Sequence, residues 1–256
     1  MFLEEISKVF ITALLSFGIT GVVVAQDFDG DAINNIRFGD NGVVYLEDFQ
    51  HYEVGTIPDE WYNRDGDAIP ATYSERDRSG YKYSVVKENS NKFLRFEGIE
   101  AKHLNFPLID KEGLDIHETP ILKWDWRIFD IPEGGDENSS SRNDVAASVY
   151  VVFDTGRLFF RTVPITIRYT WSSKHPVGSE FSKLRGNQRI VVVGTGLENR
   201  GEWQTFERNL VEDYKHFFGE KPPRRPIALL ILSASDDTRS FTKADYDNFE
   251  LHPIRN

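Results

Sequence analysis

The stretch from Leu122 to Asp154 constrains the fold more than any other part of this chain. Trp124 and Trp126 stand two residues apart, and because side chains alternate along a strand, both indoles share one face. A polar, serine-rich loop follows at 136–143, and residues 145–153 are then apolar on both faces. That pattern is typical of an inner strand covered on both sides. The stretch therefore predicts a β-hairpin whose second strand lies in the core.

Other segments have the alternation or the apolar composition of strands. Ile227–Ser233 is the most apolar run after the N-terminal segment, and its place between prolines and a polar loop predicts a buried central strand. Residues 107–120 and 172–187 have the polar, Gly- and Ser-containing composition of loops. The remaining strands are expected at 43–49, 81–86, 93–96, 101–106, 165–171, 189–193, 201–208 and 245–251.

One helix is predicted, from Leu210 to Phe218. Asn209 is a suitable N-cap, and Glu212 stands three residues further on, as in a capping box. Gly219 is a natural C-cap, and Pro222 prevents the helix from continuing.

About ten short strands with one short helix predict an all-β fold, an antiparallel two-sheet β-sandwich of the jelly-roll type. Alternating strand and helix units are missing from the sequence, which excludes a parallel α/β sheet. The length of 256 residues suits one sandwich, because single domains of this kind reach about 250 residues. We therefore expect residues 42–256 to form a single domain.

The N-terminal segment predicts export. Val9–Ala25 is an uncharged, mostly apolar run that follows Lys8 and ends in small residues, as in a signal peptide. We therefore interpret residues 1–25 as a signal peptide and 26–41 as an acidic linker, which places the mature protein in the periplasm or outside the cell. An uncleaved anchor is the alternative, but the run is at the short limit for a membrane span. No stable span is expected in the mature chain.

Composition excludes several classes of function. The formal net charge is −11 without any run of lysine or arginine, so a nucleic-acid partner is not expected. There is no cysteine, which rules out disulfides and thiolate metal sites. The histidines show no HxH or HExxH spacing, which disfavours zinc; they are His51, His103, His117, His175, His216 and His252.

Several short motifs occur in a fixed order along the chain. They are Trp124-x-Trp126, Pro132-x-Gly134, Asn143-Asp144, Tyr169-x-Trp171, Gly201-Glu202-Trp203, Arg208-Asn209 with Asp213-Tyr214, Phe218-Gly219-Glu220 and Asp236-Asp237-Thr238. This ordered set resembles a family of exported bacterial proteins, the domain-of-unknown-function family 3047. The similarity covers roughly residues 43 to 251, and it implies a jelly-roll-like fold without supplying an activity or a site residue. The family usually has two aspartates where this chain has Asn143-Asp144.

Aromatic and acidic residues near strand ends suggest a carbohydrate site. Sugars stack on aromatic faces while planar polar groups bind their hydroxyls. Core packing is the alternative for each tryptophan, and an Asx-type turn is the alternative for the aspartate pair. The candidate ligand-binding residues are Asp144, Tyr169, Trp171, Trp203, Asp236 and Asp237.

Acids on the first and last strands are candidates for a structural calcium site. Calcium takes six to eight oxygen ligands, and adjacent strands could supply them. Solvated acids at strand ends are the favoured alternative. The candidates are Glu47 or Asp48 together with Asp245 or Asp247.

The leading hypothesis is an exported, non-enzymatic sandwich that binds a carbohydrate or another cell-envelope component. A glycan hydrolase or lyase is the second hypothesis, in which Asp144, Asp236 and Asp237 supply paired carboxylates. The third is a structural or partner-binding protein of the envelope. The first two hypotheses require polar and aromatic groups to meet in a place that solvent can reach.

Overall fold

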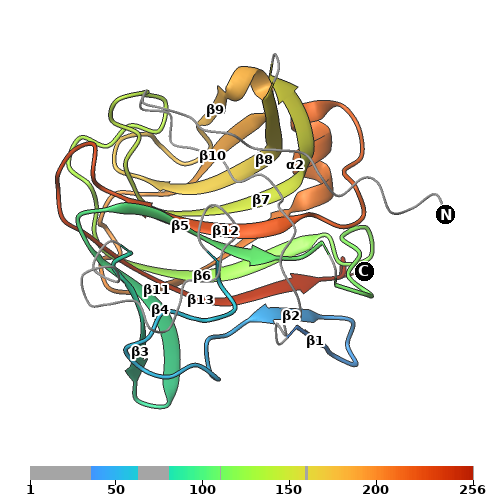
Figure 1. Ribbon diagram of the computed structural model, residues 1–256, viewed down its shortest axis with the longest axis horizontal. Coiled ribbons are helices and arrows are strands. Elements are labelled where there is room, and N and C mark those ends of the chain that lie inside the picture. The colour runs from blue at the N-terminus through green and yellow to red at the C-terminus, as the bar shows by residue number, and fades with distance from the viewer. Residues whose placement is uncertain (1–35, 63–80, 110, 159–160, 256) are drawn as a thin grey trace.

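Two β-sheets packed face to face form the body of the protein (Figure 1). The computed structural model describes residues 36–62, 81–109, 111–158 and 161–255. The seven-stranded sheet holds β1 (Arg37–Phe38), β2 (Val44–Glu47), β3 (Tyr83–Glu88), β4 (Asn91–Gly98), β6 (Ile121–Asp130), β11 (Trp203–Asn209) and β13 (Thr242–His252). The six-stranded sheet holds β5 (Ala101–Pro107), β7 (Val145–Leu158), β8 (Arg161–Ser172), β9 (Glu180–Lys183), β10 (Gln188–Thr195) and β12 (Ala228–Ala234).

The sandwich is antiparallel apart from one strand pair. β10 runs parallel to β8, and every other pairing within the described residues is antiparallel. β13 organises the seven-stranded sheet because it pairs with β2, β4 and β6 along its length. The predicted all-β, two-sheet, jelly-roll-like sandwich is confirmed.

The hairpin predicted for Leu122–Asp154 is wrong. β6 pairs with β11 and β13, whereas β7 pairs with β8 and β12 in the other sheet. The loop 131–144 therefore crosses from one sheet to the other. A hairpin turn usually takes two to five residues, and a loop as long as this one leaves the chain free to change sheets. The prediction that β7 is buried on both faces is confirmed, since residues 145–153 are all buried.

The segment 172–187, predicted as a loop, contains the short strand β9 and a 3₁₀ turn, η1 (Leu184–Gly186). β9 pairs with the outer edge of β10. Its residues alternate between exposed and half-buried, so β9 lacks the apolar face that makes a strand recognisable in a sequence.

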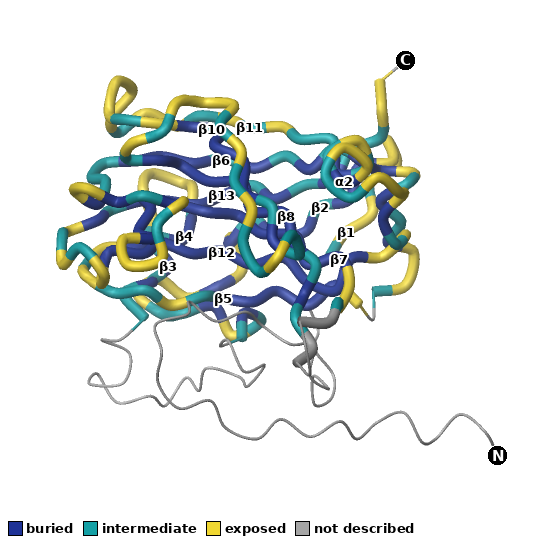
Figure 2. Tube along the Cα trace, turned by 90° about the horizontal axis from the view of Figure 1, so that it is seen from above, coloured by how far each residue is buried: buried dark blue, intermediate teal, exposed yellow. Residues whose placement is uncertain are grey.

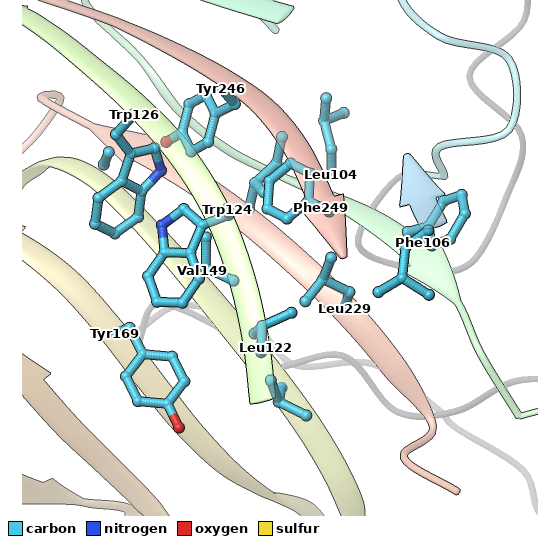
Figure 3. Close-up of a cluster of buried hydrophobic side chains, with 14 of the residues drawn as sticks. Leu104, Phe106, Leu122, Trp124, Trp126, Val149, Tyr169, Leu229, Tyr246 and Phe249 are labelled. Carbon is cyan, nitrogen blue, oxygen red and sulfur yellow. The ribbon is translucent and has the colours of Figure 1, made fainter. Parts of the chain in front are cut away.

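Large aromatic side chains from both sheets fill the space between them (Figure 3). Trp124 and Trp126 meet edge to face, with ring centroids 5.3 Å apart, on the inner face of β6. Tyr169 of the opposite sheet lies 5.6 Å from Trp124, and Tyr246 lies 6.3 Å from Trp126. The Tyr246 hydroxyl hydrogen-bonds the Ser233 hydroxyl at 2.8 Å, which satisfies its polar end inside the core.

The predicted helix is α2 (Leu210–Phe218), with both predicted caps. The Asn209 side chain accepts hydrogen bonds from the amides of Val211 and Glu212, each at 3.1 Å. Gly219 ends the helix with a φ of 79°, which favours glycine. Tyr214 packs edge to face on Phe153 of β7, 4.8 Å between centroids, so α2 covers one end of the core.

Buried residues run along the strands, while the exposed ones lie in the connections and at the ends (Figure 2). The predicted signal peptide and most of the predicted linker fall outside the described residues. Arg37 and Phe38 lie in that predicted linker but pair with β2. No helix in the described part of the chain is long and apolar enough to cross a membrane.

Truncating Trp124 tests the packing between the sheets. Its side chain is fully buried, so we expect Trp124→Ala to lower the free energy of unfolding by about 3–5 kcal/mol. Urea denaturation followed by circular dichroism measures the change. Leu197→Ala is the control, because Leu197 is exposed and should change stability by less than about 0.5 kcal/mol. Equal effects of the two substitutions would contradict this account of the core.

Candidate functional site

The structure separates the predicted ligand-binding residues into three locations. Tyr169 and Trp171 point into the core, where both are buried. The Tyr169 hydroxyl donates to Asp213 Oδ2 at 2.8 Å, and Trp171 Nε1 donates to the carbonyl of Gly196 at 2.9 Å. Neither residue reaches the surface where a ligand would bind.

The three predicted aspartates meet beside the loop 131–144. Asp144 Oδ2 accepts hydrogen bonds from the amide and the hydroxyl of Thr238, each at 2.6 Å. Asp237 Oδ2 accepts from the amide of Asn143 at 3.1 Å. Burial raises the pKa of Asp144, and the charges of Asp236 and Asp237 add to the rise. The acids therefore converge, but without Tyr169, Trp171 or Trp203.

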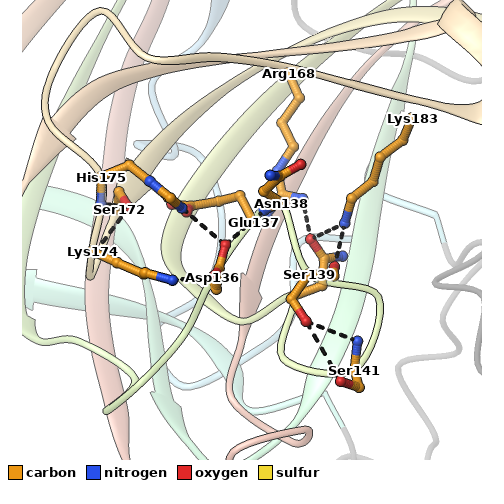
Figure 4. Close-up of polar contacts among 11 residues, drawn as sticks. Asp136, Glu137, Asn138, Ser139, Ser141, Arg168, Ser172, Lys174, His175 and Lys183 are labelled. Carbon is orange, nitrogen blue, oxygen red and sulfur yellow. Dashed lines mark hydrogen bonds and ion pairs between the residues drawn. The ribbon is translucent and has the colours of Figure 1, made fainter.

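A cluster of polar side chains extends from these acids across the outer face of the six-stranded sheet (Figure 4). Arg168 of β8 is almost completely buried; its Nη1 donates to Asn143 Oδ1 at 3.2 Å and its Nε to Ser148 Oγ at 2.9 Å. Lys183 of β9 donates to the same Asn143 oxygen at 2.7 Å and to the Ser139 carbonyl at 2.9 Å. Burial, with the charge of Arg168, lowers the pKa of Lys183 to about 8.

Asp136, Glu137 and His175 form the far side of this cluster. His175 Nε2 lies 2.9 Å from Asp136 Oδ1, and the Lys174 ammonium donates to Asp136 Oδ2 at 2.5 Å. These two contacts hold the pKa of Asp136 well below its usual range. Glu137 is fully buried, and neither of its carboxylate oxygens has a hydrogen-bond partner among the described residues. One oxygen from each acid and a ring nitrogen of His175 lie within 4.8 Å of one another.

Sequence reasoning missed this cluster. Its acids lie in the loop whose polar, serine-rich composition is described above, and its cations come from β8 and from the chain between β8 and β10. The sequence holds no spacing pattern that connects these segments, because they meet only in the folded sheet. The alternation of residues 165–171 puts Arg168 on the polar face of that strand, but it does not show that a loop covers this face.

Trp203 lies in the third location, on the outer face of the seven-stranded sheet. The side chain of Trp203 is 37% exposed, whereas the other tryptophans, which include Trp61, are buried. The Arg127 guanidinium lies 4.7 Å from the centre of the Trp203 ring, and Phe93 meets that ring edge to face at 5.3 Å.

Ion pairs hold the arginine beneath Trp203. Arg127 Nε donates to Asp245 Oδ2 and its Nη1 to Glu88 Oε2, both at 2.8 Å. Arg95 Nε donates to the other Asp245 oxygen at 2.7 Å. Trp203, Arg127, Asp245 and Arg95 occupy directly opposed positions on β11, β6, β13 and β4, so they form one row across the sheet.

The predicted calcium ligands have hydrogen-bond partners in the chain. Asp245 contacts the two arginines just described, and Asp48 pairs with Arg37 at 2.5 Å. Glu47 Oε1 accepts from the Phe49 amide at 2.7 Å, and its Oε2 accepts from the Tyr52 hydroxyl and Trp61 Nε1 at 2.9 Å.

Asp247 accepts from Asn91 Nδ2 at 2.7 Å and from the Asn248 amide at 2.9 Å. A cavity of about 230 Å³ is lined by residues that include Arg37, Glu47, Asp48 and His51. Calcium at these residues stays a prediction.

Comparison with known proteins identifies a family. The sequence model of a family described as a protein of unknown function (DUF3047) matches residues 70–250. No curated protein matches the chain.

Solved structures similar to this chain include two carbohydrate-binding modules of Clostridium thermocellum cellulosomal cellulases. The family 11 module is 11% identical with a TM-score of 0.38, covering 84% of this chain and 97% of the module. The family 30 module is 12% identical with a TM-score of 0.36, covering 78% and 95%. An exo-β-agarase is 11% identical with a TM-score of 0.40, covering 83% of this chain and 25% of the enzyme.

Two buried acids predict how stability changes with pH. Burial raises the pKa of Glu47 and of Asp247 to about 7 each. Both carboxyls therefore bind a proton more tightly in the folded chain than in the unfolded chain, and the stability that they contribute at low pH is lost as the pH rises through about 7. We expect the free energy of unfolding of Asp247→Asn, relative to the natural chain, to rise between pH 5 and pH 8 by on the order of 2 kcal/mol.

Urea denaturation at a series of pH values measures this difference. Asp40→Asn removes an exposed acid and is the control for loss of surface charge. A stability difference that is flat with pH would contradict the assignment to Asp247. Calcium chloride in the same series tests the calcium prediction, since bound calcium requires an ionised carboxylate and should stabilise the protein more at pH 8 than at pH 5.

Proposed function

This chain belongs to the DUF3047 family, whose description names no activity, and we propose that it binds a carbohydrate, without catalysis, on the outer face of the seven-stranded sheet around Trp203. The proposal includes export to the periplasm or the cell exterior, where envelope glycans are the available ligands. Export rests on the apolar sequence of residues 9–25, which lies outside the described residues.

The exposure of Trp203 is the observation that carries the proposal. Large aromatic side chains of a sandwich normally go to its interior, as the other tryptophans of this chain do. A sugar ring has a face of C–H groups that can stack on an indole. Tryptophan offers this contact area while losing little side-chain entropy.

The indole is held in place before any ligand arrives. Arg127 stacks against it at 4.7 Å, and Asp245 and Glu88 hold the guanidinium from two directions. The Asp245 carboxylate is completely buried, so this support cannot easily move into solvent. A binding group that is already ordered costs less free energy to immobilise, which favours affinity.

Polar groups suited to sugar hydroxyls surround the ring system. The side chain of Glu88 is 43% exposed although it accepts from both arginines, and a carboxylate has lone pairs for further donors. Lys243 lies 5.2 Å from the centre of the Phe129 ring and pairs with Glu97 at 3.1 Å. This surface therefore combines an aromatic platform with charged donors and acceptors.

The catalytic alternative depends on acids elsewhere in the molecule. Asp144, Asp236 and Asp237 do converge, as a hydrolase or lyase would require. However, Asp144 is buried and accepts two hydrogen bonds from Thr238, which favours a role in holding the loop. Release of new sugar ends is therefore an outcome that the test must include.

The experiment is a calorimetric titration of the purified chain against a panel of soluble polysaccharides and envelope glycans. We expect at least one glycan to bind, and Trp203→Ala to weaken it by about tenfold or more, which corresponds to about 1.4 kcal/mol. Trp203→Tyr keeps an aromatic platform and should retain most of the affinity. Phe241→Ala is the control, because it removes another exposed aromatic ring.

Three results would overturn the proposal. They are a lack of binding to every member of the panel, binding that Trp203→Ala leaves unchanged, and release of reducing or unsaturated ends from the bound glycan. The last result would establish the enzymatic alternative, and Asp144→Asn would then be the variant to test. Circular dichroism of Trp203→Ala confirms that a loss of binding does not come from unfolding.

A further inference from the structure

We propose that Asp136, Glu137 and His175 form a binding site for a divalent transition-metal ion of the Zn²⁺ type. The site lies in the polar cluster beside the six-stranded sheet (Figure 4), so it is independent of the carbohydrate surface around Trp203. It also differs from the calcium candidates, which lie at the end of β2, just after it and on β13.

Local structure positions the three side chains. The loop 131–144 is anchored where the Asp136 amide donates to the Arg142 carbonyl at 2.6 Å. Gly135 packs so closely against the Asp144 backbone that an added Cβ would lie 2.5 Å from its oxygen. On the other side, the amide of His175 donates to Ser172 Oγ at 2.9 Å, which fixes the turn after β8. The candidate ligands are thus held by contacts of their own segments.

The distances suit a small ion. Ligand atoms around a tetrahedral zinc are about 3.4 Å apart, given metal–ligand bonds of about 2.1 Å. His175 Nε2 lies 2.9 Å from Asp136 Oδ1 and 3.9 Å from Glu137 Oε2, one distance on each side of that value. An ion would replace the hydrogen bond between His175 and Asp136. Lys174 could keep its contact with Asp136, because it binds the other oxygen, Oδ2.

Glu137 indicates that a cation belongs here. Its carboxylate is fully buried, and both oxygens lack hydrogen-bond partners in the part of the chain that the structure describes. Buried carboxylates in proteins are usually paired or coordinate a metal. No neighbouring cation in the described part of the chain hydrogen-bonds Glu137, since Lys183 donates to Asn143 and Ser139, and Arg168 donates to Asn143 and Ser148. His175 Nε2 lies 3.9 Å from Glu137 Oε2, beyond hydrogen-bond distance.

The donor set selects the class of ion. An imidazole nitrogen with two carboxylates is typical of zinc and related transition metals, whereas calcium and magnesium prefer an all-oxygen set. Three protein ligands leave one coordination position open. Asp136 and His175 are partly exposed, with side-chain exposures of 18% and 20%, so that position can face solvent. The absence of an HxH or HExxH motif does not argue against this site, because its ligands come from two separate segments.

The test titrates zinc chloride into the complete chain after dialysis against EDTA, with calcium chloride as a parallel titration. We expect one zinc ion per chain and weaker or no binding of calcium. His175→Gln and Glu137→Gln should each weaken zinc binding by at least about tenfold, a loss seen even for residues that only support a ligand. His216→Gln is the matched control, because His216 also pairs with an acid, Glu180, at 3.2 Å, but on an exposed surface. The His216→Gln variant should bind zinc with the same affinity as the natural chain.

The proposal is overturned if zinc does not bind, if calcium binds more tightly, or if neither variant weakens binding. If Glu137→Gln fails to fold, His175→Gln decides the matter, because His175 is partly exposed. Cobalt(II) provides a second readout, since its visible spectrum should change between the natural chain and His175→Gln. Trp203→Ala should bind zinc normally, which separates this proposal from the carbohydrate proposal.

Discussion

The contact between the aromatic faces of the two sheets supports the rest of the structure. Trp124 and Trp126 come from the seven-stranded sheet, and Tyr169 and Trp171 come from the six-stranded sheet. Each ring buries a large apolar area, and the edge-to-face arrangement of Trp126 and Trp171 suits the charge distribution of the π systems. The sheets must therefore keep a fixed register against each other. The exposed residues lie mainly in the connections between strands, at the surface of the molecule.

This arrangement uses the outer faces of the sheets in different ways. The outer face of the seven-stranded sheet carries a row of paired charges that ends at an exposed indole, and it stays open to solvent at Trp203. On the six-stranded sheet, the loop 131–144 lies against Arg168, and the polar side chains there form a buried network. An open aromatic platform suits a ligand that binds by stacking. A buried network whose Glu137 carboxylate accepts no hydrogen bond from the described residues suits a small ion.

Much of the fold could be predicted from local sequence patterns. The caps of α2, the two-sided burial of β7 and the shared face of Trp124 and Trp126 depend on neighbouring residues only. Which strands pair with each other was harder to predict from the sequence. β6 and β7 belong to different sheets, because strand pairing over a long loop is decided by which edges are free in the assembled sandwich. β9 was missed because it lacks an apolar face. The aspartates near Thr238 could be suspected but not brought together from sequence alone.

The sequence by itself determined the class of fold and the helix with its caps, because hydrophobic periodicity and capping are local properties. It did not determine which aromatic residues form the core, since Tyr169 and Trp171 were candidates for ligand binding and are buried. Only the tertiary structure decided which polar residues meet. His175 reaches Asp136 and Glu137 because the turn after β8 lies beside a loop that crosses between sheets. Likewise, Trp203 stays exposed because β11 pairs with β6 in a register that places it over Arg127. Contacts between distant segments depend on the whole packing arrangement, which no spacing within a single segment encodes.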